Sequence, residues 1–182
     1  MKKVLLSVML SFLMFVSIPM TANAKVRLDT LKDDTFVNLS DTDKEDTIKA
    51  IAEKLAKDLP LSTPPNFYFY SCKEWAAIAN YYQGIDYIYF NLGIFNDSED
   101  ADAAGETVGY HLVKSIAHEM RHDFQWEHQN DDSDYGRACK INYTSYVDYY
   151  NDLNGYNAQF LEQDANQYAI DYANRYFKIR SK

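Results

Sequence analysis

The segment from Thr107 to about Glu127 constrains the fold of this chain more than any other part of the sequence. Counted at about 100° per residue, its apolar residues gather on one side, which predicts a single amphipathic helix. Its opposite side carries a polar stripe that is rich in histidine. Such a helix is expected to lie between a hydrophobic core and a cleft, with an ordinary solvated face as the alternative. The apolar side consists of Leu112, Val113, Ile116, Ala117, Met120 and Phe124, and the polar stripe consists of His111, Ser115, His118, His122 and Gln125.

Two of these histidines belong to the sequence His118-Glu119-Met120-Arg121-His122, which has the form H-E-x-x-H. Residues four apart on a helix face the same way, so the two imidazoles can bind one Zn²⁺ with Glu119 beside the metal. His111 lies about 10 Å before His118 along the axis, too far to share the metal but close enough to line the cleft. The remaining histidine, His128, lies off the stripe and is expected at the surface.

The last helix, expected over about Asn157 to Ile179, supplies the acidic candidates for a third ligand. On a helical wheel, Glu162 lies about 50° from the centre of the apolar stripe and Asp164 about 110° away, so Asp164 is expected to face water. A carboxylate at the edge of a buried stripe needs a partner, and a metal ion is one. Glu162 is therefore the expected third ligand, with Asp164 in reserve and a solvent-exposed Glu162 as the alternative. The apolar stripe consists of Leu161, Ala165, Tyr168, Ala169, Tyr172 and Tyr176.

These residues stand in two patterns, His118-Glu119-x-Arg121-His122-x-x-Gln125 and Glu162-x-x-Ala165-Asn166-x-Tyr168-Ala169. Together the patterns resemble the compact gluzincin metallopeptidases, a zincin-like group that has thermolysin as a larger relative. The resemblance spans about Tyr87 to Tyr172 and implies that Zn²⁺ is held by His118, His122 and Glu162. It further implies hydrolysis of a peptide or protein substrate, with Glu119 as the general base that takes a proton from a metal-activated water.

The surroundings of the metal are expected to follow the same group. The resemblance implies a short sheet whose edge strand, within Ile85 to Asn91, borders the cleft. It also implies that Asn166 steadies a zinc-binding histidine. A donor to the oxyanion is required as well, and the candidates are His111 and a tyrosine between Tyr143 and Tyr156. Arg121 projects away from the metal stripe and is expected to form a salt bridge rather than to act in catalysis.

The remaining segments predict a further helix and several short strands. N-cap candidates lie at Ser40 to Asp43, where Thr42 and Glu45 match a capping box, and the helix that follows ends before Pro60. We therefore expect one α+β domain over residues 25–182, with a short mixed or antiparallel sheet packed on the motif helix and the C-terminal helix. Strands are expected at Thr35–Leu39 and Asn66–Cys72, and a hairpin is expected from Ala76–Tyr82 and Ile85–Asn91, the first of which has helical turns as the alternative.

Three further segments have simple interpretations. The acidic stretch Asn96–Glu106 is expected as a solvated loop, with a calcium site as a weak alternative. Gln129–Gly136 is expected as a polar loop, and Asn142–Asn154 is rich in tyrosine and asparagine. Cys72 and Cys139 are expected either as a disulfide or as two separate buried thiols.

Residues 1–24 have the pattern of a signal peptide. Lys2 and Lys3 precede an apolar run from Val4 to Met20, and Ala22-Asn23-Ala24 is a small-x-small cleavage site. The alternative is an uncleaved membrane anchor, for which the apolar run is short. The protein is therefore expected to be secreted to the extracellular space or the periplasm, without a membrane partner after cleavage.

Charge and composition exclude some partners and leave others open. The chain has 182 residues with 27 Asp and Glu against 18 Lys and Arg, a net charge of −9, so it lacks the basic footprint that a nucleic acid requires. Two functions other than that of a peptidase stay open as alternatives. One is a zincin-shaped binding or inhibitor module that holds the metal and cleaves nothing. The other, suggested by 16 tyrosines, is an envelope protein that binds carbohydrate.

Overall fold

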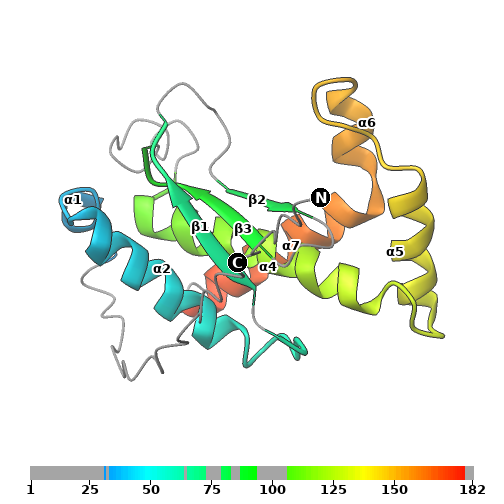
Figure 1. Cartoon of the computed structure of the whole chain (residues 1–182), viewed down its shortest axis with the longest axis horizontal. Coiled ribbons are helices and arrows are strands. Elements are labelled where there is room, and N and C mark those ends of the chain that lie inside the picture. Colours follow the sequence, from blue (N-terminus) through cyan, green and yellow to red (C-terminus); the bar gives the residue numbers. More distant parts are fainter. Residues whose placement is uncertain are drawn as a thin grey trace, which may run out of the picture.

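The computed structural model describes residues 31, 33–63, 65–72, 79–82, 87–93 and 106–178, and within these ranges the fold is of the mixed α+β class (Figure 1). The expected signal peptide, residues 1–24, lies outside the described residues, as does nearly all of the acidic loop with its alternative of a calcium site. The elements, in chain order, are α1 (Asp33–Phe36), α2 (Asp41–Leu55), β1 (Asn66–Tyr70), β2 (Ala79–Tyr82), β3 (Tyr87–Asn91), α4 (Val108–His128), α5 (Asp134–Thr144), α6 (Leu153–Ala158) and α7 (Phe160–Tyr176).

The sheet has the strand order β1-β3-β2, with β1 parallel and β2 antiparallel to β3. In the central strand, Ile88 is paired with Phe67 of β1 on one side and with Tyr81 of β2 on the other. This mixed sheet agrees with the expected hairpin. The expectation of an edge strand within Ile85 to Asn91 is wrong, however, because β3 pairs with β1 on one side and with β2 on the other. Among the described residues, β2 is the edge strand beside α4.

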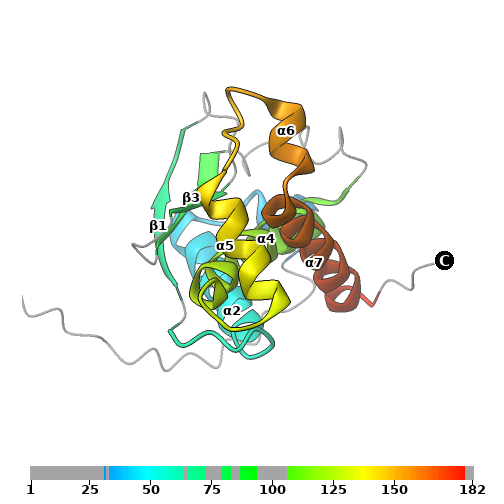
Figure 2. The same cartoon turned by 90° about the vertical axis from the view of Figure 1, so that its right-hand side faces the viewer.

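The strands form because aromatic and β-branched residues favour a pleated, half-buried surface. Successive side chains point to opposite faces, so Ile88 and Phe90 of β3 are buried in the core while Tyr87 is exposed. Figure 2 shows the helices gathered on one side of β1 and β3. The same buried cluster includes Ile48 of α2 and Leu112 of α4, so the core lies between the sheet and the helices.

The first helices differ in part from the expectation. The Ser40 hydroxyl accepts a hydrogen bond from the backbone N–H of Asp43 at 3.2 Å and caps α2, so the capping residue is Ser40 and not Thr42. The expected strand at Thr35–Leu39 is wrong: α1 ends at Phe36 and a turn follows. Phe36 is fully buried in the helical core, and this tertiary contact outweighs the local β preference.

The C-terminal half is helical throughout most of its length. α4 begins after the N-cap Thr107, close to the expected start. The last expected helix is divided at Gln159, whose extended backbone (φ −74°, ψ 148°) separates α6 from α7. Helix α5 covers part of the expected polar loop and of the tyrosine-rich stretch, and in Figure 1 α5 and α6 lie at one end of the molecule, beyond the sheet.

Cys72 and Cys139 are both free thiols, so of the two alternatives the structure has the one without a disulfide. Within the described ranges, no helix combines the length and the apolar composition that crossing a bilayer would require.

Candidate metal centre

His118 and His122 of α4 and Glu162 of α7 bring three metal-ligating atoms together. The two histidine Nε2 atoms are 3.0 Å apart, Glu162 Oε2 is 3.4 Å from His118 Nε2, and Glu162 Oε1 is 3.5 Å from His122 Nε2. Ligand atoms around a tetrahedral zinc, at about 2.0–2.1 Å from the metal, lie about 3.3 Å from one another. The two imidazole nitrogens and the two carboxylate oxygens are therefore spaced at about the separation of ligand atoms around one metal ion, with a different Glu162 oxygen nearest each imidazole.

The local structure explains why these residues meet. The two histidines are four residues apart on α4 and so share one face of the helix. Helix α7 packs along α4 through small and apolar side chains that include Leu161 and Ala165, both fully buried. Glu162 stands next to Leu161 at the edge of this contact and is only 1% exposed. The carboxylate is therefore held under the imidazoles by the packing of two long helices.

The electrostatics of the cluster favour a charged carboxylate. Burial raises the pKa of Glu162, but hydrogen bonding and charge from His118 and His122 outweigh it and hold the pKa far below its ordinary value of 4.5. Burial alone lowers the pKa of His122, and the Glu162 carboxylate outweighs that effect and raises it. An anion buried between two imidazoles thus creates a site that attracts a cation.

The donor set fits a zinc ion. Two imidazole nitrogens and one carboxylate oxygen are a known catalytic ligand set for Zn²⁺. Glu162 Oε1 accepts a hydrogen bond from the Tyr146 hydroxyl at 3.1 Å. The buried Oε2 has no such well-formed hydrogen bond within the described part of the chain, and its neighbour there is His118 Nε2 at 3.4 Å. A buried acceptor that is only weakly bonded is costly, and a metal ion would satisfy it.

Glu119 lies between the two histidines in the sequence and points toward the sheet. Its Oε2 accepts a hydrogen bond of 2.7 Å from the backbone N–H of Tyr81 in the edge strand β2. The residue is 8% exposed. A charge-assisted bond to a backbone N–H holds a carboxylate in one place, so Glu119 is fixed at the boundary between α4 and β2.

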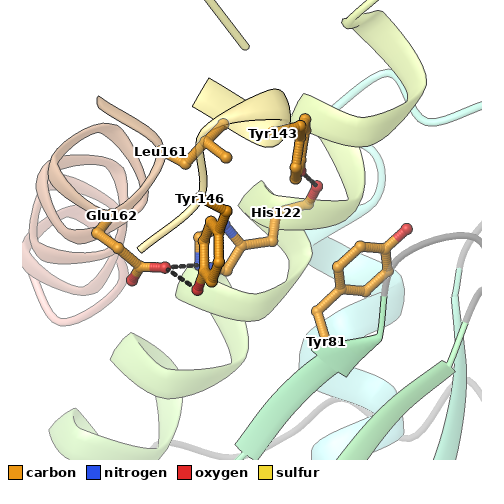
Figure 3. A pocket seen from close by; sticks show the side chains of 6 residues that line it. All are labelled: Tyr81, His122, Tyr143, Tyr146, Leu161 and Glu162. Atoms are coloured by element: carbon orange, nitrogen blue, oxygen red, sulfur yellow. Dashed lines mark hydrogen bonds and ion pairs between the residues drawn. The ribbon is translucent and has the colours of Figure 1, made fainter. Parts of the chain in front are cut away.

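A small cavity of about 40 Å³ adjoins the cluster, lined by Tyr81, His122, Tyr143, Tyr146, Leu161 and Glu162. Figure 3 shows Tyr146 and His122 both directed at the Glu162 carboxylate, while the Tyr143 hydroxyl donates to the backbone oxygen of His122. Burial, and next the negative charge of Glu162, raise the pKa of Tyr146 well above 10, so this hydroxyl keeps its proton.

The two other histidines lie away from the centre. His111 Nδ1 is 3.1 Å from Glu106 Oε2, outside the cluster. The hydroxyls of Tyr146 and Tyr156 both interact with Glu162 and remain candidates for the oxyanion donor. His128 stacks on Phe124 with ring centroids 3.9 Å apart, and its Nδ1 is 2.9 Å from the Phe124 carbonyl oxygen. It is half-buried rather than fully at the surface.

The residue that contacts the far side of His122 is Gln125. Its Oε1 is 2.7 Å from His122 Nδ1, and three-residue spacing on α4 places the two side chains on one face. The expectation for Asn166 is wrong, because Asn166 is exposed on α7. Gln125 belongs to the histidine stripe of the sequence, and its spacing of three residues from His122 is the feature that predicts their contact.

Arg121 forms the expected salt bridge. Its Nε and Nη2 donate to the two carboxylate oxygens of Asp164 at 2.8 and 3.1 Å. Asp164 also accepts hydrogen bonds from Gln125 and from the Tyr135 hydroxyl, both at 2.8 Å. The expectation that Asp164 faces water is wrong, because α5, which carries Tyr135, lies over it.

Comparison with known proteins gives no match to a protein-family model, to a curated protein or to a solved structure.

Proposed function

We propose that this protein is an exported zinc metallopeptidase of the compact gluzincin type. His118, His122 and Glu162 hold the metal, and Glu119 is the general base. The observation that carries the proposal is the spacing of the three ligand atoms, which all lie within 4.8 Å of one another. Their arrangement on two helices that pack along each other supports a preformed site rather than a chance cluster of polar residues.

The chain's own residues supply the remaining parts of a hydrolase. When bound, Zn²⁺ supplies a Lewis acid that activates water and polarises a peptide carbonyl. Glu119, with one oxygen fixed by the Tyr81 N–H, takes a proton and passes it to the leaving amine. Tyr146 keeps its proton and, by turning its hydroxyl from Glu162 Oε1, would donate to the oxygen on which negative charge develops. The strand β2, apart from the Tyr81 N–H that donates to Glu119, would offer backbone groups to an extended peptide.

Metal analysis and peptide hydrolysis test the proposal together. We expect purified residues 25–182 to contain one zinc per chain, and we expect His122→Ala to contain none. Cleavage of a mixed peptide library should depend on zinc and be lost in Glu119→Gln with zinc retained. A wild-type protein that cannot be loaded with zinc would rule the proposal out.

The second candidate is a metal-holding module without catalysis. The small cavity at the cluster supports it, because about 40 Å³ is far below the roughly 300–1,000 Å³ of ligand-binding pockets. In this case, the wild type and Glu119→Gln both bind zinc and both leave every peptide of the library intact. The same experiment therefore separates the two candidates.

Export rests on residues 1–24, which we propose are removed after Ala24 as a signal peptide. The substrates are then proteins of the cell envelope or the extracellular space. Amino-terminal sequencing of the exported protein should begin at Lys25. Full-length protein that stays in the cytosol would contradict export without affecting the proposed metal site.

A further inference from the structure

We propose that Gln125 is a positioning residue that holds His122 in the tautomer with the proton on Nδ1, which leaves the Nε2 lone pair directed at the metal position. The inference deepens the proposed function, and its value for metal binding rests on that function. The tautomer itself is a property of the chain without a metal.

The side-chain amide of Gln125 is hydrogen-bonded at both its nitrogen and its oxygen. The residue is fully buried, and its three side-chain contacts use all of its hydrogen-bonding groups save one acceptor lone pair. Nε2 donates to the Leu161 carbonyl oxygen at 2.9 Å and to Asp164 Oδ2 at 2.8 Å. Oε1 is 2.7 Å from His122 Nδ1.

These contacts permit only one orientation of the amide. The Leu161 carbonyl accepts only, and Asp164, held ionised by Arg121, also accepts only. A flipped amide would place its oxygen against both of these oxygens and would lose two hydrogen bonds in a buried site. The Gln125 oxygen must therefore face His122, and Nδ1 must carry the proton that this oxygen accepts.

The consequence for the metal position follows from the imidazole ring. A neutral imidazole carries one proton, so a proton on Nδ1 leaves Nε2 as the acceptor. His122 Nε2 is the atom that faces His118 and Glu162. The same amide binds the carbonyl of Leu161, the residue before Glu162, so Gln125 joins the two helices that supply the ligands.

The first test measures the tautomer in zinc-free protein. Two-bond ¹H–¹⁵N correlation spectra distinguish the imidazole tautomers, and they are recorded at a pH at which the imidazoles are neutral. We expect His122 in the Nδ1–H form. His111, which lies away from the cluster with its Nδ1 3.1 Å from Glu106 Oε2, is the internal comparison and should keep its signals in every Gln125 variant.

Three variants separate positioning from a merely structural role. Gln125→Leu removes the acceptor, and we expect a mixture of His122 tautomers and zinc binding weakened about 10- to 100-fold. Gln125→Glu keeps an acceptor but loses both donors, so it should preserve the Nδ1–H form although it strains the contact with Asp164. Tyr135→Phe removes a bond to Asp164 without touching Gln125 and should leave the tautomer and zinc affinity unchanged.

The outcomes are decisive in both directions. An Nε2–H His122 in the wild type overturns the inference, as does an unchanged tautomer in a folded Gln125→Leu. If Gln125→Leu does not fold, Gln125→Glu with the Nε2–H form also overturns it. A wild type that binds no zinc would contradict the proposed function but would leave the measured tautomer of His122 unaffected. Failure of the proposed function and failure of this inference are therefore distinguishable.

Discussion

The Glu119 carboxylate and the backbone N–H of Tyr81 form a 2.7 Å hydrogen bond that joins helix α4 to the edge strand β2. The bond gives Glu119 two separable roles. One is chemical, because a carboxylate can accept a proton from water whereas the carboxamide of a glutamine cannot. The other is structural, because a carbonyl-type oxygen at this position satisfies a backbone donor of the strand.

Substitutions of Glu119 should separate these two roles. Glu119→Gln keeps an oxygen for the Tyr81 N–H and should lose peptide hydrolysis while its free energy of unfolding changes little. Glu119→Ala removes the acceptor, so we expect both loss of hydrolysis and destabilisation by about 1–3 kcal/mol. Urea unfolding followed by circular dichroism measures the difference. Equal stability of the two variants would show that the hydrogen bond does not hold β2.

Zinc should stabilise the folded protein through linkage. Free zinc at about 100 times its dissociation constant contributes about 2.7 kcal/mol, so thermal unfolding should shift upward by several degrees and return on chelation. Glu162→Gln removes the anionic ligand and should abolish the shift. Asn166→Ala changes an exposed residue of the same helix and is the matched control. A shift that persists in Glu162→Gln would place the metal elsewhere.

The sequence predicts the ligand-bearing helices because their signals are local. Apolar periodicity over about twenty residues identifies α4, and the wheel position of Glu162 beside Leu161 follows from one helix alone. Strand order is different, since the placement of β1 on the free side of β3 depends on a distant segment. The sequence therefore predicted the hairpin and misplaced the edge strand.

Helix α5 carries a part of the site, the bond from Tyr135 to Asp164, that the sequence does not predict. Its buried residues are only Gly136, Cys139 and Asn142, so no apolar stripe identifies it as a helix. It is supported instead by tertiary contacts, such as the bond from Tyr135 to Asp164. The position of Asp164 on a helical wheel of α7 alone predicts a solvent-exposed side chain, because the wheel does not include α5. In the structure Asp164 is bonded to Arg121, Gln125 and Tyr135, beside the candidate metal centre.

The salt bridge between Arg121 and Asp164 should contribute measurably to stability. Both side chains are largely buried, with 15% and 21% exposure, so removal of one partner leaves a poorly solvated charge. We expect Asp164→Ala to cost about 3 kcal/mol, and Arg121→Met combined with it to cost less than the sum of the single changes. A double-mutant cycle from chemical denaturation measures the coupling. Additive effects would contradict a coupled pair.

Glu106 should make stability depend on pH. Burial raises its pKa, but bonds from Lys114 and then His111 outweigh this and bring the pKa below 4.5. Because the folded-state pKa is the lower one, the stabilisation is present above pH 4.5 and is lost as the pH falls through the lowered value. Glu106→Gln should therefore cost about 0.5–1 kcal/mol at pH 7 and almost nothing in acid. Urea titrations from pH 3 to 7 test this, and a constant difference would contradict it.

Cys139 should be chemically inert in the native protein. Burial raises the pKa of its thiol to about 11, so about one molecule in a thousand carries the reactive thiolate at pH 8. Iodoacetamide at pH 8 should therefore modify the half-buried Cys72 first, and both cysteines only after denaturation. Peptide mass spectrometry identifies the labelled sites, with Cys72→Ser as the variant that should remain unlabelled when folded. A Cys72–Cys139 linked peptide in unreduced protein, or equal labelling of both thiols, would contradict the arrangement of these two residues.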